Sequence, residues 1–224
     1  MSREFLRETV DYKGYAINIY YDNDAESPRS WDNLGTIYSN HRDYNPDDHS
    51  IDELLNDDGR LDEDELSKYF IWLPVYAYIH SGITVSTGHG YPYNDRWDSG
   101  LFGIIAVSKE RVKKEYGWKI ITQKRREQIE KYLDGEIEIL DQWYTGDVYG
   151  YVIEIGEDSE DEVELPEIQF DSCWGFFGEE GVDEMVIEAK ANIDAELEAY
   201  AKAEAARIER ETLFDNIYST TCCD

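Results

Sequence analysis

Acidic side chains are so numerous in this sequence that any fold it adopts must expose a strongly negative surface. The chain has 51 Asp and Glu residues against 21 Lys and Arg, a formal net charge of −30 over 224 residues. Direct binding to nucleic-acid phosphates or to an anionic membrane face needs a basic surface, so neither is expected. The sequence is also 41% hydrophobic and 14% aromatic, unlike disordered acidic chains. We therefore expect a folded acidic protein.

The cysteines and the N-terminus favour a cytoplasmic location. There are three cysteines, two of them adjacent at Cys222 and Cys223, so no disulfide framework is predicted. The first residues, MSREFLRETV, contain acids and no apolar signal-peptide core. The longest apolar run, residues 70–79, is broken by Pro74 and is shorter than the roughly 20 residues that a membrane helix needs.

Alternation of apolar side chains with a period of two predicts β-strands. The stretch 13–21 places Tyr15, Ile17 and Ile19 on one face, and shorter strands are indicated at 34–39 and 83–86. Each longer strand has an apolar face that must be covered, so we expect the longer strands to share one sheet. These strands are 15–21, 71–79, 101–107 and 147–155.

Helices are predicted after Ser108, ending at Gly117, and from Thr122 to Leu133, closed by Gly135. The strongest helical pattern spans residues 182–213, where apolar residues recur every three or four positions. They are Val182, Val186, Ala189, Ile193, Leu197 and Tyr200.

These elements predict an α+β fold, a mainly antiparallel sheet with helices packed on one face and a long C-terminal helix. We expect residues 1–155 to form the core domain, with an acidic insertion at 43–65. Residues 156–224 would form an acidic arm and a C-terminal helical region.

Two segments concentrate the acids. Residues 43–65 contain eleven acids and one base, Arg60, and residues 154–167 contain eight acids and no base. Leucines at positions 54, 55, 61 and 66 would anchor the first segment to the fold. The predicted partner-binding residues are Asp43, Asp47, Asp48, Asp52, Glu53, Asp57, Asp58, Asp62, Glu63, Asp64, Glu65, Glu157, Asp158, Glu160, Asp161 and Glu162. By contrast, residues 109–126 carry eight bases against two acids, which we interpret as local neutralisation or as a face for a second acidic subunit.

The common catalytic fingerprints, such as phosphate-binding glycine loops and zinc-protease helices, are missing from the sequence. A calcium loop at 54–65 fails because its first position, Leu54, has no oxygen ligand in its side chain. A metal-dependent hydrolase using His80, His89 and either Asp95 or Asp98 remains an alternative, since imidazole and carboxylate suit several divalent ions. The leading prediction is a protein without catalytic residues, metal or cofactor.

The central block resembles a family of acidic proteins from bacteriophages and mobile elements. The resemblance rests on WLPVYAYIHSGITVSTG at 72–88, WDSGLFGIIAVSK at 97–109, KEYGW at 114–118 and GDVYG at 146–150. It covers about residues 70–155 and implies no particular activity. It does imply a mobile-element setting, in which small acidic proteins often disarm host restriction or CRISPR systems.

Charge and resemblance together predict an inhibitor that imitates DNA. Duplex DNA presents one negative charge per roughly 1.7 Å of axis, and carboxylates fixed on a fold produce a similar field. The predicted partner is a host DNA-binding defence protein or complex with a basic cleft, occupied in place of its nucleic acid. Besides the hydrolase, a second alternative is an oligomeric acidic scaffold, with a homodimer formed through the 182–213 helix.

Overall fold

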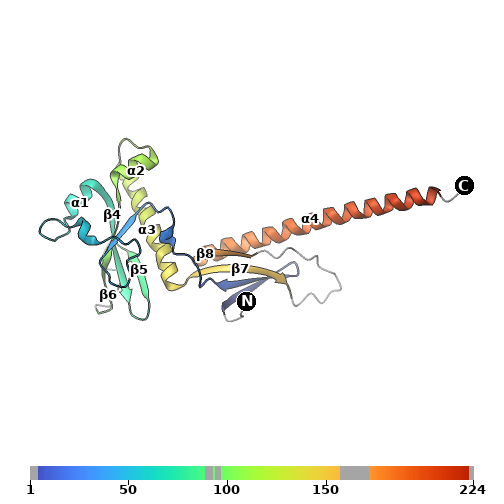
Figure 1. The fold of residues 1–224 in the computed structure, drawn as a ribbon, viewed down its shortest axis with the longest axis horizontal. Coiled ribbons are helices and arrows are strands. Elements are labelled where there is room, and N and C mark those ends of the chain that lie inside the picture. Colours follow the sequence, from blue (N-terminus) through green and yellow to red (C-terminus); the bar gives the residue numbers. More distant parts are fainter. Residues whose placement is uncertain (1–4, 89–92, 94–96, 157–171, 222–224) are drawn as a thin grey trace. The chain divides into compact units, whose positions relative to one another are not determined.

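The chain folds into two units, each containing a four-stranded antiparallel sheet (Figure 1). The computed structural model describes residues 5–88, 93, 97–156 and 172–221. The terminal unit comprises Met1–Asn23 and Val148–Asp224, and the central unit comprises Asp24–Asp147. This division differs from the expected boundary at residue 155, because the strand before that boundary pairs with an N-terminal strand.

The terminal unit has the strand order β1-β2-β7-β8, and α4 packs on its sheet. Its elements are β1 (Leu6–Tyr12), β2 (Tyr15–Tyr21), β7 (Val148–Ile155), β8 (Ser172–Phe177) and α4 (Gly178–Thr221). Lys13 and Gly14 join β1 to β2 with φ angles of 51° and 83°, the positive values that a two-residue hairpin turn requires. The buried core consists of Tyr15, Ile17, Ile19, Tyr149, Tyr151, Ile153, Val182, Met185, Ala189 and Ile193.

The predicted C-terminal helix is confirmed, and it begins four residues earlier than its apolar pattern indicated. Its spacing buries Val182, Ala189 and Ile193 against the sheet, whereas Tyr200 is 50% exposed. Nearly all side chains from 198 to 213 are exposed. Contact with the core of the terminal unit therefore ends near Leu197.

The central unit has the strand order β3-β6-β4-β5. Its strands are β3 (Thr36–Ser39), β4 (Phe70–Ile79), β5 (Ile83–Thr87) and β6 (Ser99–Ser108). Its helices are η2 (Pro28–Ser30), η3 (Ile51–Leu54), α1 (Glu63–Tyr69), α2 (Lys109–Tyr116) and α3 (Gln123–Thr145).

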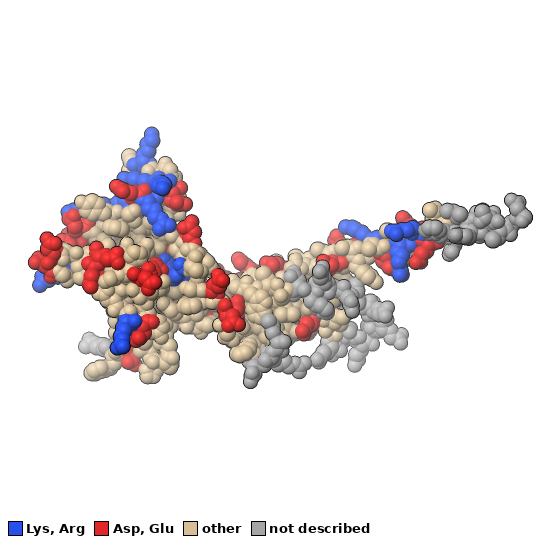
Figure 2. Space-filling view, in the orientation of Figure 1, with Lys and Arg blue, Asp and Glu red and all other residues tan. Residues whose placement is uncertain are grey.

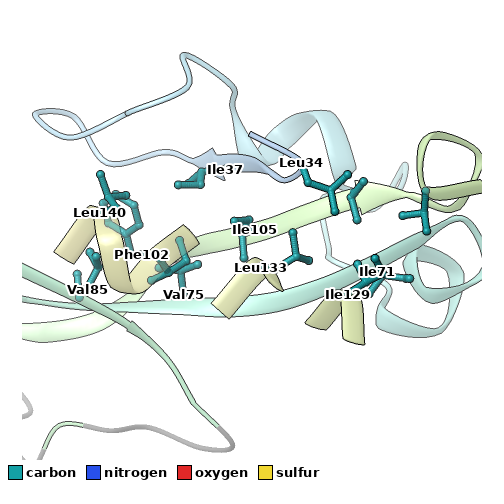
Figure 3. Packing of buried hydrophobic residues seen from close by; sticks show 14 of the residues in the cluster. Leu34, Ile37, Ile71, Val75, Val85, Phe102, Ile105, Ile129, Leu133 and Leu140 are labelled. Carbon is teal, nitrogen blue, oxygen red and sulfur yellow. The ribbon is translucent and has the colours of Figure 1, made fainter. Parts of the chain in front are cut away.

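Both faces of the central sheet are covered. Successive side chains of a strand point to opposite faces, so Ile105 of β6 packs with Leu133 of α3 on one side (Figure 3). Ile104 packs on the other side, in a cluster with Leu66 of α1. Partly buried Leu54 and Leu61 join that second cluster, so apolar side chains anchor the acidic segment to the sheet. The α+β fold class is confirmed.

Two expectations about the fold are wrong. The four longer strands do not share a sheet: those at 15–21 and 147–155 belong to the terminal unit, and those at 71–79 and 101–107 to the central unit. The helix after Thr122 does not stop near Gly135 but continues to Thr145, where Gly146 caps it. A glycine inside a helix costs about 1 kcal/mol, which is less than the gain from burying the apolar stripe that α3 carries on both sides of it.

The expected Ser108 cap and Gly117 terminus of α2 are confirmed. The Ser108 hydroxyl accepts a hydrogen bond from the Arg111 N–H at 3.1 Å, and Gly117 adopts the left-handed conformation with a φ of 64°.

Candidate functional site

The candidate site is the exposed acidic surface of the central unit. It is defined here as ten residues: Asp43, Asp48, Asp52, Glu53, Asp57, Asp58, Asp62, Glu63, Asp64 and Glu65. All ten side chains are exposed, on the loop before η3, on η3, on the turn that follows and on α1. Figure 2 shows acidic side chains gathered over this part of the central unit. The segment thus combines an apolar inner side with a carboxylate-rich outer side.

Local hydrogen bonds fix the backbone that carries these carboxylates. At the start of η3, the Ser50 hydroxyl accepts from the Asp52 N–H at 3.1 Å, and Glu53 accepts from the Ser50 N–H at 3.0 Å. Asp62 caps α1 by accepting from the Glu65 N–H at 2.9 Å. These bonds hold the acids in defined positions rather than on a loose chain.

The turn between η3 and α1 is held in the same way. The Asn56 side-chain oxygen accepts from the N–H groups of Asp58, at 3.1 Å, and Arg60, at 3.0 Å. Gly59 has a φ of 71°, which glycine adopts without steric cost. The Asn56 oxygen therefore serves this turn, at the place where a calcium loop was considered.

Few of these carboxylates are neutralised by bases. Glu65 pairs with Lys68 at 2.5 Å. Glu53 lies 3.1 Å from the His49 ring, and hydrogen bonds from His49 and from the Ser50 N–H lower the pKa of Glu53 below its ordinary value. Eight acids of the surface have no ion-pair partner among the described residues: Asp43, Asp48, Asp52, Asp57, Asp58, Asp62, Glu63 and Asp64.

Asp47 does not belong to the acidic surface, although the sequence placed it among the exposed acids. Its side chain is only 12% exposed and accepts two hydrogen bonds from Arg29, at 2.8 and 2.7 Å. It also accepts from the Ile37 N–H at 2.7 Å. Asp47 therefore has a structural role, which its neighbour Asp48 does not share.

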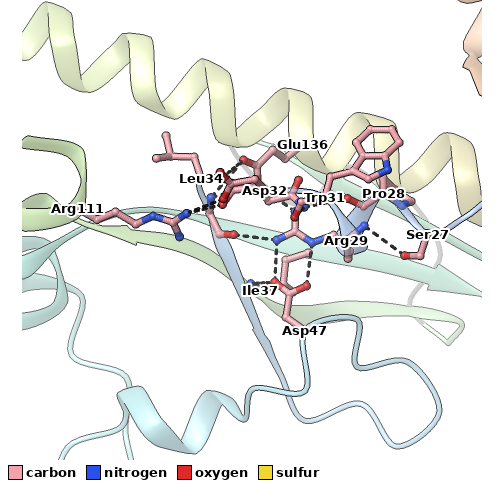
Figure 4. A network of polar contacts seen from close by, with 12 residues as sticks. Ser27, Pro28, Arg29, Trp31, Asp32, Leu34, Ile37, Asp47, Arg111 and Glu136 are labelled. Carbon is pink, nitrogen blue, oxygen red and sulfur yellow. Dashed lines mark hydrogen bonds and ion pairs between the residues drawn. The ribbon is translucent and has the colours of Figure 1, made fainter. Parts of the chain in front are cut away.

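Arg29 joins Asp47 to Glu136 of α3 (Figure 4). The Arg29 side chain is 4% exposed, and its guanidinium lies 2.9 Å from Glu136 and donates to the Gly35 carbonyl at 2.8 Å. Burial by itself lowers the pKa of Arg29, but the hydrogen bonds and charges of Asp47 and Glu136 outweigh it and raise the pKa. The Glu136 carboxylate also accepts from the Leu34 N–H at 2.7 Å.

Sequence reasoning missed this network. Its one available signal was Glu136, an acid within the apolar stripe that Ile129, Leu133, Ile137 and Leu140 form on α3. A charged residue at such a position needs a buried partner. The three charged side chains of the network are at most 12% exposed, and their hydrogen bonds to the backbone position the segment before β3.

The residues of the hydrolase alternative are only partly described. His80 lies 3.1 Å from Asp98, whereas His89 and Asp95 lie outside the described residues. Within the described part of the chain, no group of three or more His, Cys, Asp or Glu residues is arranged to hold a metal ion. The second acidic segment, with Glu157, Asp158, Glu160, Asp161 and Glu162, also lies outside the described residues.

A scan against protein-family models and searches of curated proteins and of solved structures found no match to this chain. Among the described residues, no helix combines the length and the apolar character that a membrane crossing requires.

Proposed function

We propose that this chain is an acidic decoy, which occupies the basic cleft of a DNA-binding protein through the acidic surface of the central unit. The observation that carries the proposal is the exposure of ten carboxylates on a segment whose backbone is fixed by side-chain caps and turns. A basic cleft built for DNA attracts a dense and rigid array of negative charge. The biological role we propose is inhibition of a host restriction or CRISPR system from a phage or mobile element.

The unpaired state of the acids supports this function. Crowded like charges repel one another, and the pairing of carboxylates with nearby bases would relieve that repulsion. Here Arg60 is exposed within the segment, yet it forms no ion pair in the described part of the chain. Apolar contacts of Leu54, Leu61 and Leu66 with the sheet hold the segment in place instead. The charges are thus left free to meet an external partner.

The binding test uses matched sets of neutralised carboxylates. The first variant carries Asp43→Asn, Asp48→Asn, Asp57→Asn and Asp58→Asn, four acidic-surface residues that lie outside helices and have no ion-pair partner among the residues that the structure describes. The control variant neutralises four exposed acids of α4 that form no ion pair within the described part of the chain, Asp183→Asn, Glu184→Gln, Glu188→Gln and Glu196→Gln. Both variants have the same net charge, so a difference between them reports the position of the charges.

The partner would be captured by affinity purification from host cells and then titrated with each variant in competition with duplex DNA. We expect the acidic-surface variant to bind about 10-fold to 100-fold more weakly, from about 0.2–1 kcal/mol per charge pair, mainly through slower association. The control should stay within threefold of the parent, and salt should reduce the difference. Equal weakening in both variants, or binding that duplex DNA does not displace, would contradict the proposal.

An oligomeric scaffold is the second candidate, because α4 exposes apolar side chains beyond its contact with the sheet. Tyr200 is 50%, Ile208 53% and Leu213 62% exposed. Association of two copies through the face of α4 that carries Tyr200 and Ile208 would cover those two side chains. Light scattering would then detect a homodimer that Ile208→Asp converts to monomer; a monomeric parent chain at high concentration would remove this candidate.

A further inference from the structure

The basic segment 109–126 forms a hollow at one end of the central unit. The hollow lies between α2, the connection 117–122 and the first turn of α3, and it has a volume of about 360 Å³. Figure 2 shows Lys and Arg side chains gathered where Figure 1 places α2. The lining residues are Lys109, Lys113, Lys119, Ile120, Ile121, Thr122, Gln123 and Arg126. Four of them are cationic and none is acidic.

Two of the four cations are held by the protein. Lys109 donates to the Ser67 carbonyl oxygen at 2.7 Å, and Arg126 pairs with Glu130 at 2.7 Å. Lys113 and Lys119 are exposed and have no ion-pair partner among the described residues. The interpretation of this segment as local neutralisation of the acidic protein therefore accounts for some of its bases, but not for these two lysines.

We propose that this hollow binds a small molecule that carries a di- or triphosphate group. Lysine ammonium groups and the Arg126 guanidinium are suited to phosphate oxygens, which carry a negative charge and accept hydrogen bonds. Thr122 and Gln123 add polar groups, and Ile120 and Ile121 provide an apolar wall for the remainder of the ligand. The volume lies at the lower end of the range for small-molecule sites.

The net charge of the chain limits the size of this ligand. Charges are screened beyond about 8 Å at physiological salt, so a small phosphate compound in the hollow experiences mainly the local cations. A long polyanion would extend beyond the hollow and meet the rest of a chain that has 51 acids against 21 bases. The hollow therefore favours a phosphorylated small molecule over a nucleic-acid strand. This site is independent of the acidic surface, so the two proposals stand or fall separately.

The test titrates the full-length protein with inorganic tripolyphosphate by calorimetry, with sulfate at equal ionic strength as the comparison anion. We expect one saturable site for tripolyphosphate and none for sulfate. Lys113→Gln and Lys119→Gln should each weaken binding about threefold to fivefold, and the double variant by tenfold or more. Circular dichroism should show that each variant keeps its fold, because both lysines are exposed.

Lys124→Gln is the matched control. Lys124 lies in the first turn of α3, is exposed and has no ion-pair partner among the described residues, but it does not line the hollow. Its replacement should change tripolyphosphate binding by less than twofold. The proposal is overturned if no saturable binding occurs or if Lys124→Gln weakens binding as much as Lys113→Gln. It is also overturned if a single-stranded oligonucleotide without a terminal phosphate binds as tightly as tripolyphosphate.

Discussion

Replacing Asp47 by Asn is expected to destabilise the central unit far more than the same replacement at Asp48. Asp47 receives three hydrogen bonds, two from Arg29 and one from the Ile37 N–H, and its side chain is 12% exposed. Asp48 is exposed and has no ion-pair partner in the described part of the chain. The two adjacent residues undergo the same chemical change in opposite environments.

The expected magnitude follows from the contacts of Arg29. An Asn at position 47 carries no charge, and its amide group cannot accept from both guanidinium nitrogens as the carboxylate does. Removing one partner of a buried ion pair costs about 3–5 kcal/mol. Because Glu136 still lies 2.9 Å from Arg29, we expect a loss at the lower end, about 3 kcal/mol. Asp48→Asn should stay within about 0.5 kcal/mol, since Asn tolerates the φ of 56° at that position.

Urea unfolding and native-state hydrogen exchange measure this difference. The hydrogen-exchange rate of the Ile37 amide, which donates to Asp47, reports the stability of the central unit. A loss of 3 kcal/mol corresponds to about 100-fold faster exchange where the amide opens by global unfolding. Raising salt should leave the effect in place, because buried pairs are screened weakly. Equal unfolding midpoints for the two variants would refute the assignment of Asp47 to a stabilising network.

Three further outcomes are expected. Gly35→Ala should destabilise the central unit by about 1–3 kcal/mol in urea unfolding, because an added Cβ would lie 2.6 Å from the Leu133 side chain. Gly135→Ala should stabilise the central unit by about 0.5–1 kcal/mol, because an added Cβ there meets open space and alanine favours the helix. Burial raises the pKa of Tyr144 to about 12, so the contribution of its neutral phenol to stability is present below pH 10 and is lost as the pH rises towards 12. Tyr144→Phe should remove this component of alkaline unfolding. An unchanged dependence of the unfolding free energy on pH in this variant would contradict the prediction. Ile193→Ala should cost about 2–5 kcal/mol, whereas removal of residues 201–224 should leave the melting temperature of the terminal unit nearly unchanged, as calorimetry would show.

Local sequence patterns predicted a helix or strand correctly where the residues of that element alone decide its conformation. The alternation of Tyr15, Ile17 and Ile19 predicted β2, and the spacing of Val182, Ala189 and Ile193 predicted the helix and its buried face. β1 was missed because it lacks a clearly apolar face: none of its side chains is fully buried. Its conformation depends on pairing with β2, which its own residues do not indicate.

The candidate site was likewise predicted only in the part that depends on local sequence. Acidity and anchoring leucines are properties of the 43–65 segment itself, so the segment was predicted as a binding surface, and ten of its eleven carboxylates are exposed in the structure. The burial of Asp47 depends on Arg29, 18 residues away, and on Glu136, a further 89 residues along the chain from Asp47. No local pattern distinguishes Asp47 from Asp48.

The charge of the protein, the acidic character of the 43–65 segment and the helix or strand class of the longer elements all follow from residues that are neighbours along the chain, so the amino-acid order is enough to predict them. The folded chain was needed to show that the strands divide between two sheets, that Gly135 lies inside α3, and that one hollow is lined by Lys109, Lys113, Lys119 and Arg126. Those outcomes depend on which distant segments pack together, and packing energy is shared among residues that the sequence places far apart.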